Sequence, residues 1–297
     1  MRFFDRFRRN VADVLGLFIG PAVVACLPWP AAFAVLKLLA RRGIGFSNEA
    51  DAAWNIAQPH LRDADMREWK MRARLMKWVE RVDTYLTLMH GSQWWKRHVD
   101  VVGEFPPGAA PYLLLTYHWG AGNWVWKLLR EHAIPAYFLA RRPEALDFGT
   151  SRVALWYGRL RVWGLSRIGS LGPLYTGDSS RQIKETWTRG ESVVGMLDLP
   201  ARGEQKTERV PLLDGQVRLP SGLVRLAETS GTRVVLLSCG LDFDTGRRRL
   251  RIETLAEGLD VAGVLTRYAG HLDARLHDAP EAWHMWHEAD LIFVDGS

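Results

Sequence analysis

The segment with the most distinctive chemistry in this 297-residue chain is 116–126, which reads TYHWGAGNWVW. It places His118 directly after an apolar run, residues 112–117, and before a turn that contains two glycines. The apolar run predicts a short buried strand, and residues 123–132 predict a helix. Ligands of open α/β sheets bind at the carboxyl ends of strands. His118 is therefore a candidate catalytic base, and a histidine that only caps the strand is the alternative.

The elements that would position His118 are strands that alternate with helices. The expected strands span residues 136–140, 192–197, 233–239 and 248–254, and the expected helices span residues 45–100, 179–189, 222–229 and 261–290. This alternation predicts an α/β fold, with a mixed, mostly parallel sheet flanked by helices on both faces.

The N-terminal residues have the character of a membrane-associating segment. Residues 1–10 mix phenylalanine with arginine, and residues 14–36 contain no charged side chain. A basic-aromatic segment followed by an apolar one suits an anionic bilayer surface. Pro28 and Pro30 predict two short hydrophobic helices, one ending near Leu27 and one over 31–42, in place of one spanning helix. A cleaved signal peptide is the competing interpretation, but no convincing cleavage site follows.

These features divide the chain into an N-terminal hydrophobic helical anchor, residues 1–43, and a second domain, residues 44–297, with a helical lead-in over 44–105. The chain has a formal net charge of +6 and a pI of about 9.5, which favours anionic partners. Its basic residues are scattered and form no nucleic-acid motif, so a phospholipid surface or an acidic carrier protein is expected and nucleic acid is not. Cys26 and Cys239 are far apart and favour neither a disulfide framework nor a cysteine-ligated metal.

The segment around His118 resembles the H-x4-D/E block of the lysophospholipid acyltransferase superfamily, and within it the bacterial lipid A lauroyl/myristoyl acyltransferases, whose block is close to HFGNWE. Other segments resemble blocks of that family in the same order along almost the whole chain. They are Arg142-Pro143, YGRLR at 157–161, RGESVVGMLDL at 189–199, VPLLDGQVRLPSGLVRLA at 210–227 and APEAWHMWH at 279–287. Each segment alone is a weak signal, and the ordered series is a strong one.

The resemblance implies a glycerolphosphate-acyltransferase-like fold and a membrane-associated O-acyltransferase. His118 would take the proton from the hydroxyl of a lipid or glycolipid acceptor, which attacks the thioester of an acyl carrier protein or coenzyme A. No cofactor is implied beyond this co-substrate. The implied location is the cytoplasmic face of the bacterial inner membrane.

The chain departs from the family pattern at the acidic residue of the block. Asn123 stands five residues beyond His118, and if Ala121 and Gly122 are an insertion the position of the acid falls to Val125. Asn123 could support the imidazole through a neutral hydrogen bond. Asp198 could approach from a neighbouring strand end. The alternative is a catalytically degraded relative that binds lipid or an acyl carrier without turnover.

Candidate substrate-binding residues follow from the same blocks. Arg142 and Arg159 are candidate anion clamps, because an arginine fork suits phosphate. Ser221 opens a predicted helix, where it would help to receive an anion or would cap the helix. Trp119 and Trp124 are expected to line the site. The glycine-rich segment 169–177 lacks the lysine of a P-loop and is expected to be a loop that shapes the acceptor site. The histidines of 271–287 lack the H-E-x-x-H spacing, so no metal site is expected.

Overall fold

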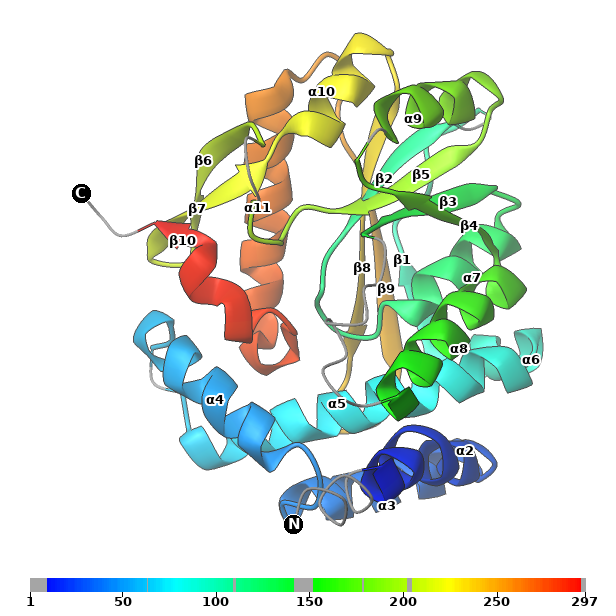
Figure 1. Ribbon diagram of the computed structural model, residues 1–297, viewed down its shortest axis with the longest axis vertical. Helices are drawn as coiled ribbons and strands as arrows, with labels where there is room; N and C mark the ends of the chain where they lie inside the picture. Colours follow the sequence, from blue (N-terminus) through cyan, green and yellow to red (C-terminus); the bar gives the residue numbers. More distant parts are fainter. Residues whose placement is uncertain are drawn as a thin grey trace.

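The computed structural model describes residues 10–62, 64–108, 111–141, 152–177, 179–201 and 205–294. Its central sheet has seven strands (Figure 1). In spatial order they are β1 (Val99–Val102), β9 (Arg248–Thr254), β8 (Arg233–Leu241), β2 (Tyr112–Thr116), β5 (Ser192–Met196), β3 (Ala136–Ala140) and β4 (Ser170–Tyr175). The strands from β8 to β4 are parallel, and β9 runs antiparallel to β8. The predicted α/β fold with a mostly parallel mixed sheet is confirmed.

Helices flank this sheet, and Figure 1 shows α5 crossing below the lower ends of β8 and β9. They are α4 (Ser47–Ala57), α5 (Met66–Met89), α6 (Ser92–His98), α7 (Asn123–Glu131), α8 (Arg152–Ile168), α9 (Ser179–Thr188), α10 (Gly222–Thr229) and α11 (Val261–Asp278), with a short 3-10 turn, η2 (Gln58–His60), before α5. The strand β2 is buried along its whole length, as its apolar sequence predicts. A second, antiparallel sheet combines β6 (Thr207–Leu212), β7 (Gly215–Pro220) and β10 (Phe293–Val294), and β6 packs against α11.

The N-terminal helices lie against the body of the protein. The π-helical turn η1 (Leu15–Ile19) leads into α2 (Gly20–Ala25), and α3 (Trp29–Arg41) follows the turn at Pro28. Both α2 and α3 pack along α5. None of the helices in the described part of the chain combines the length and the apolar character needed to span a bilayer.

Three expected elements differ in the structure. The expected helix 261–290 ends at Asp278, because Pro280 cannot continue it, and two 3-10 turns follow, η4 (Pro280–Ala282) and η5 (Trp286–Leu291). The expected loop 169–177 forms the edge strand β4, whose register shift and positive φ at Gly172 are tolerated at a sheet edge. The helical stretch that begins near residue 45 ends at His98 and continues as β1.

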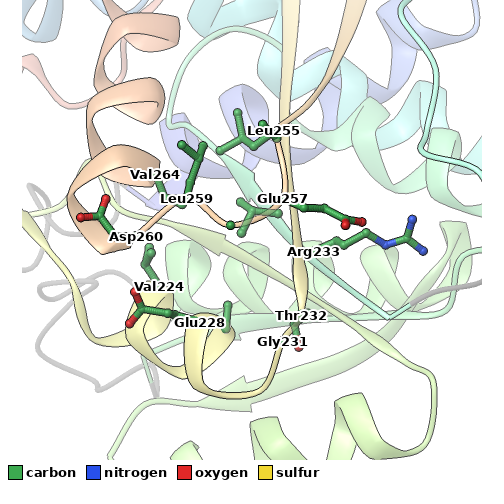
Figure 2. Close-up of a pocket in the computed structure, with 14 residues that line it drawn as sticks. Val224, Glu228, Gly231, Thr232, Arg233, Leu255, Glu257, Leu259, Asp260 and Val264 are labelled. Carbon is green, nitrogen blue, oxygen red and sulfur yellow. The ribbon is translucent and has the colours of Figure 1, made fainter.

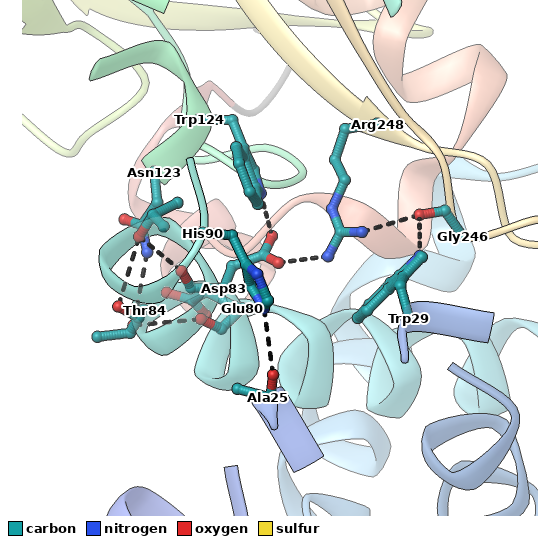
Figure 3. A network of polar contacts seen from close by, with 11 residues as sticks. Ala25, Trp29, Glu80, Asp83, Thr84, His90, Asn123, Trp124, Gly246 and Arg248 are labelled. Carbon is teal, nitrogen blue, oxygen red and sulfur yellow. Dashed lines mark hydrogen bonds and ion pairs between the residues drawn. The ribbon is translucent and has the colours of Figure 1, made fainter. Parts of the chain in front are cut away.

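A fully buried ion pair joins β9 to α5. The guanidinium of Arg248, 0% exposed, bonds the carboxylate of Asp83 and donates to the carbonyl of Gly246 at 2.9 Å (Figure 3). The indole of Trp124 donates to the second carboxylate oxygen of Asp83 at 2.8 Å, and that of Trp29 donates to Gly246 at 3.0 Å. The guanidinium also lies over the rings of Trp29, Trp94 and Trp124 at 3.8, 5.3 and 5.4 Å from their centroids. Hydrogen bonds therefore hold both terminal nitrogens of the guanidinium and both oxygens of the carboxylate, aromatic rings lie close to the guanidinium, and only Nε of Arg248 is buried without a hydrogen-bond partner.

We expect Asp83→Ala to lower the free energy of unfolding by about 3–5 kcal/mol, because it leaves the guanidinium of Arg248 buried and unpaired. Denaturant unfolding monitored by circular dichroism measures this loss. The control is Asp214→Ala, which breaks the exposed pair with Arg62, whose side chains are 82% and 60% exposed, and should cost at most about 1 kcal/mol. Equal losses in the two variants would contradict this account of the core.

Candidate active site

The candidate site forms where β2 and β5 end side by side. These parallel neighbours pair with Thr116 opposite Met196, the last residue of each strand. His118 and Asp198 each lie two residues beyond that pair. Equal offsets from a paired position bring the two side chains to the same level of the sheet, at its carboxyl edge.

Asp198 holds His118 through both of its carboxylate oxygens. Oδ1 lies 3.0 Å from Nδ1 of His118, and Oδ2 accepts the backbone N–H of His118 at 2.8 Å. The indole N–H of Trp283 also donates to Oδ2, at 2.9 Å. Because the carboxylate accepts the Nδ1 proton, the neutral imidazole carries its lone pair on Nε2. This is the tautomer that a general base needs.

The imidazole of His118 is more exposed than its partner. The side chain of Asp198 is 1% exposed, whereas that of His118 is 27% exposed. The ring bond to Asp198 is made by Nδ1, and among the described residues none forms a hydrogen bond with Nε2. The carboxylate is thus buried, and Nε2 keeps a lone pair that the protein does not use.

The two partners shift each other's pKa in opposite directions. Burial lowers the pKa of His118, but the charge of Asp198 and its hydrogen bond outweigh burial and leave the pKa raised. Burial raises the pKa of Asp198, but His118 and the indole of Trp283 outweigh it and leave the pKa lowered. The carboxylate therefore stays ionised, and the protonated imidazole is stabilised.

Tyr268, from α11, fastens the two strand ends together. Its hydroxyl donates to the carbonyl of Thr116 at 2.9 Å and accepts the N–H of Leu197 at 3.0 Å. It also lies 3.5 Å from Oδ1 of Asp198. One buried phenol thus bonds the backbone two residues before His118 and one residue before Asp198.

The turn after His118 is held between β8 and the C-terminal segment. Gly120 has a φ of +71° and donates its N–H to the carbonyl of Ala282 at 3.0 Å, while Ala121 donates to that of Cys239 at 2.8 Å. A Cβ on Gly120 would lie 2.0 Å from the carbonyl oxygen of Cys239. Glycine is therefore required here both by the backbone conformation and by the close approach of β8.

A second polar group, which the sequence did not predict, connects to His118 through His284, whose backbone N–H donates to the carbonyl of His118 at 2.7 Å. Glu80 of α5 pairs with Arg161 of α8 at 2.9 Å, and its Oε2 lies 3.9 Å from Nδ1 of His284. Burial raises the pKa of Glu80, but Arg161 and His284 outweigh it and hold the pKa well below its usual value. Burial and Lys77 lower the pKa of His284 to about 4, so His284 is neutral and donates from Nε2 to the carbonyl of Gly120 at 3.0 Å. In the sequence, Glu80 and Asp83 are two acidic residues among the apolar residues of α5, and this pattern could have indicated a buried polar group.

Models of known protein families gave no match to the chain, and neither did the curated proteins.

The expectation that Asn123 holds the imidazole is wrong. Nδ1 of His118 is taken by Asp198, and the amide of Asn123 points instead to the hydroxyl of Thr84, at 3.5 Å (Figure 3). Of the two supports considered for His118, the structure brings only Asp198 into contact with it.

Two predicted binding residues, Trp119 and Trp124, are structural. Trp119 is 4% exposed and donates to the carbonyl of Ala279 at 2.9 Å, while Trp124 is fully buried and donates to Asp83. The prediction that they line a substrate site is wrong, because both rings are buried and both indole N–H groups bond to the protein.

The hydroxyl of Ser221 is also hydrogen-bonded within the protein. Ser221 is fully buried, its hydroxyl donates to the carbonyl of Lys206 at 3.1 Å, and the hydroxyl oxygen accepts from Arg225 at 3.2 Å. Its side chain makes no capping bond to α10. The capping role considered for Ser221 is therefore wrong. The anion role was expected through backbone N–H groups at the helix start; that of Ser221 donates to the carbonyl of Lys206 at 2.9 Å, and anion binding at this helix start stays a prediction.

The two candidate arginines have different outcomes. Arg142 lies outside the described residues. Arg159 is exposed on α8, with its guanidinium 5.3 Å from the ring centroid of Trp156. The arginine of α8 that influences His118 is Arg161, which acts to lower the pKa of the imidazole.

A cavity of about 510 Å³ lies elsewhere, between α10, α11 and the start of β8 (Figure 2). Arg233, which lines it, pairs with Tyr112 at the amino end of β2, so the cavity is at the opposite edge of the sheet from His118. Within the described part of the chain, no three histidine, cysteine or acidic side chains are grouped as a metal site would require.

We expect Asp198→Asn to lower the pKa of His118. The substitution removes the negative charge that raises this pKa, and burial, which lowers it, remains. A pH titration followed by NMR of the imidazole nitrogens measures the shift. His271 is the internal control, because burial and neighbouring arginines set its pKa at about 4 and should keep it there. An unchanged titration of His118 would show that Asp198 does not control the base.

Proposed function

We propose that the chain is an O-acyltransferase that moves an acyl group from a thioester to the hydroxyl of a lipid or glycolipid. The observation that carries the proposal is the contact between His118 and Asp198. A buried carboxylate fixes the imidazole tautomer, and Nε2 keeps a lone pair that can accept a proton. The ordered resemblance to the lysophospholipid acyltransferases supports acyl transfer in particular, and with it a glycerolphosphate-acyltransferase-like arrangement of the α/β fold.

The reaction needs only the residues of this pair and its two substrates. Nε2 of His118 takes the proton of the acceptor hydroxyl while the oxygen attacks the thioester carbonyl. The imidazolium that forms is stabilised by the charge of Asp198. The tetrahedral intermediate then collapses with cleavage of the C–S bond, and the departing sulfur receives the proton from Nε2. The pair returns to its starting state.

The acyl donor in this proposal is an acyl carrier protein thioester or a coenzyme A thioester, with no further cofactor. The acceptor is a membrane lipid or glycolipid at the cytoplasmic face of the bacterial inner membrane, and residues 1–43 attach the chain to that surface. The positive net charge of the chain suits both an anionic bilayer and an acidic carrier. The missing motif acid suggests the alternative of a binding protein without turnover, and the contact of Asp198 with the imidazole supports the enzyme over that alternative.

We expect His118→Ala to abolish acyl transfer and Asp198→Asn to reduce kcat by about 10²- to 10⁴-fold, because the second variant keeps the base but loses its charge partner. Asn123→Ala is the control and should retain most activity, since Asn123 contacts Thr84 and not the imidazole.

In the wild type, kcat/KM should rise with pH through the raised pKa of His118, because only the neutral imidazole accepts a proton.

The measurement uses mass spectrometry of membrane lipids from cells with and without the gene to identify the product. Transfer from acyl carrier protein and coenzyme A thioesters is then timed with that acceptor. Full activity in His118→Ala would end this mechanism. No turnover in the wild type with any donor would leave a protein that binds lipid or carrier.

A further inference from the structure

One face of α8 presents alternating tryptophan and arginine to the outside. Trp156, Arg159, Trp163 and Arg167 follow each other at intervals of three and four residues, which places them on one side of a helix. Trp156 is 62% exposed and Trp163 is 50% exposed. The guanidinium of Arg159 lies 5.3 Å from the ring centroid of Trp156, and that of Arg167 lies 5.2 Å from the ring centroid of Trp163. We call these four residues the α8 stripe.

The composition of the α8 stripe suits the boundary between lipid headgroups and acyl chains. Tryptophan places an apolar ring in the upper acyl region and its N–H among polar headgroups. An arginine stacked on that ring reaches phosphate with its guanidinium while its aliphatic stem stays against apolar groups. Large exposed aromatic side chains grouped in this way mark an interaction site.

The α8 stripe continues onto an apolar face of the N-terminal helices. Residues 11–27 expose apolar side chains at helical spacing: Val11, Val14, Leu15, Ile19, Val23 and Leu27. Phe18 of η1 packs edge-on against Tyr157 of α8, with ring centroids 5.7 Å apart. The hydroxyl of Tyr85 also ties the carbonyl of Leu17 to α5 at 2.7 Å. Figure 1 shows the start of α8 next to these helices, so the helix that carries the α8 stripe adjoins the helices that carry the apolar face.

The opposite side of α8 belongs to the candidate active site. Arg161 pairs there with Glu80, which lies 3.9 Å from Nδ1 of His284, and the backbone N–H of His284 donates to the carbonyl of His118 at 2.7 Å. One helix therefore has its inner side at the base and its outer side at the α8 stripe. A surface bound to that outer side lies one helix diameter, about 10 Å, from the site.

We propose that the α8 stripe and the apolar face of residues 11–27 form one docking surface for an anionic phospholipid bilayer. The helices lie in the plane of the bilayer surface, with the tryptophan rings inserted and Arg159 and Arg167 on lipid phosphates. The inference rests on the membrane attachment in the proposed function and adds a second contact element, α8, and a preference for anionic lipid. The charge of the two arginines, within a chain of net charge +6, selects anionic lipid as the occupant.

The test is flotation of the full-length protein with vesicles of phosphatidylcholine, alone or mixed with phosphatidylglycerol. We expect Trp156→Ala/Trp163→Ala to reduce the partition coefficient about tenfold on both vesicles, because two large apolar rings no longer insert. Arg159→Gln/Arg167→Gln should reduce it about fivefold per arginine on the anionic vesicles only. The matched controls, Arg181→Gln on α9 and Leu291→Ala on η5, change residues that are also exposed and should bind like the wild type.

The proposal would be overturned if the wild type did not bind vesicles, or if the tryptophan variant bound them like the wild type. It would also be overturned if the variants of the α8 stripe lost binding to an acidic carrier protein but kept their binding to vesicles. Circular dichroism of each variant checks the fold. Turnover of a water-soluble acyl thioester and alcohol without vesicles separates this test from that of the reaction. The tryptophan variant should match the wild type in that assay. Absence of turnover in both would refute the acyl-transfer proposal and leave the vesicle result standing.

Discussion

The buried pair of Arg248 and Asp83 is the interaction on which the arrangement of this protein depends. Two charges removed from water are tolerated only when each is paired and hydrogen-bonded, so the pair fixes the position of β9 against α5. Trp124 binds the same carboxylate from α7, and Trp29 joins α3 to the same cluster. Glu80 lies one helical turn before Asp83 on α5. The cluster that holds the core therefore also sets the position of the carboxylate that connects to the candidate base through His284.

The chemistry of the site is built from two strand ends and not from one contiguous motif. In the resembling block the histidine and the acidic residue are five residues apart, whereas here the carboxylate that contacts His118 follows β5, eighty residues further along the chain. The imidazole of His118 is supported by this carboxylate at Nδ1. Trp283 and Tyr268 complete that support from the C-terminal part of the chain, one through the carboxylate and the other through the strand ends on either side of it.

Local sequence patterns predicted most of the individual helices and strands, but they did not predict the long-range contacts between them. The apolar runs predicted β2, β5 and β8 closely, because buried parallel strands are continuously apolar. The order of those strands in the sheet follows from packing across more than a hundred residues, and the contact of Asp198 with His118 depends on that order. Tryptophan was ambiguous in the same way: Trp119 and Trp124 are buried, whereas Trp156 and Trp163 are exposed. Composition alone could not separate the two pairs.

The register of β2 and β5 has a consequence for how this protein can change over evolution. Side chains alternate between the faces of a sheet, so a slip of one residue between these strands would move His118 and Asp198 to different levels and turn one of them away. The single residue between each strand end and His118 or Asp198 is under the same constraint, because an insertion there would move one side chain away from the other. The backbone bonds of Gly120 and Ala121 also fix the turn that follows His118. We therefore expect selection to preserve the lengths of β2 and β5 more strictly than the residues of the motif around His118.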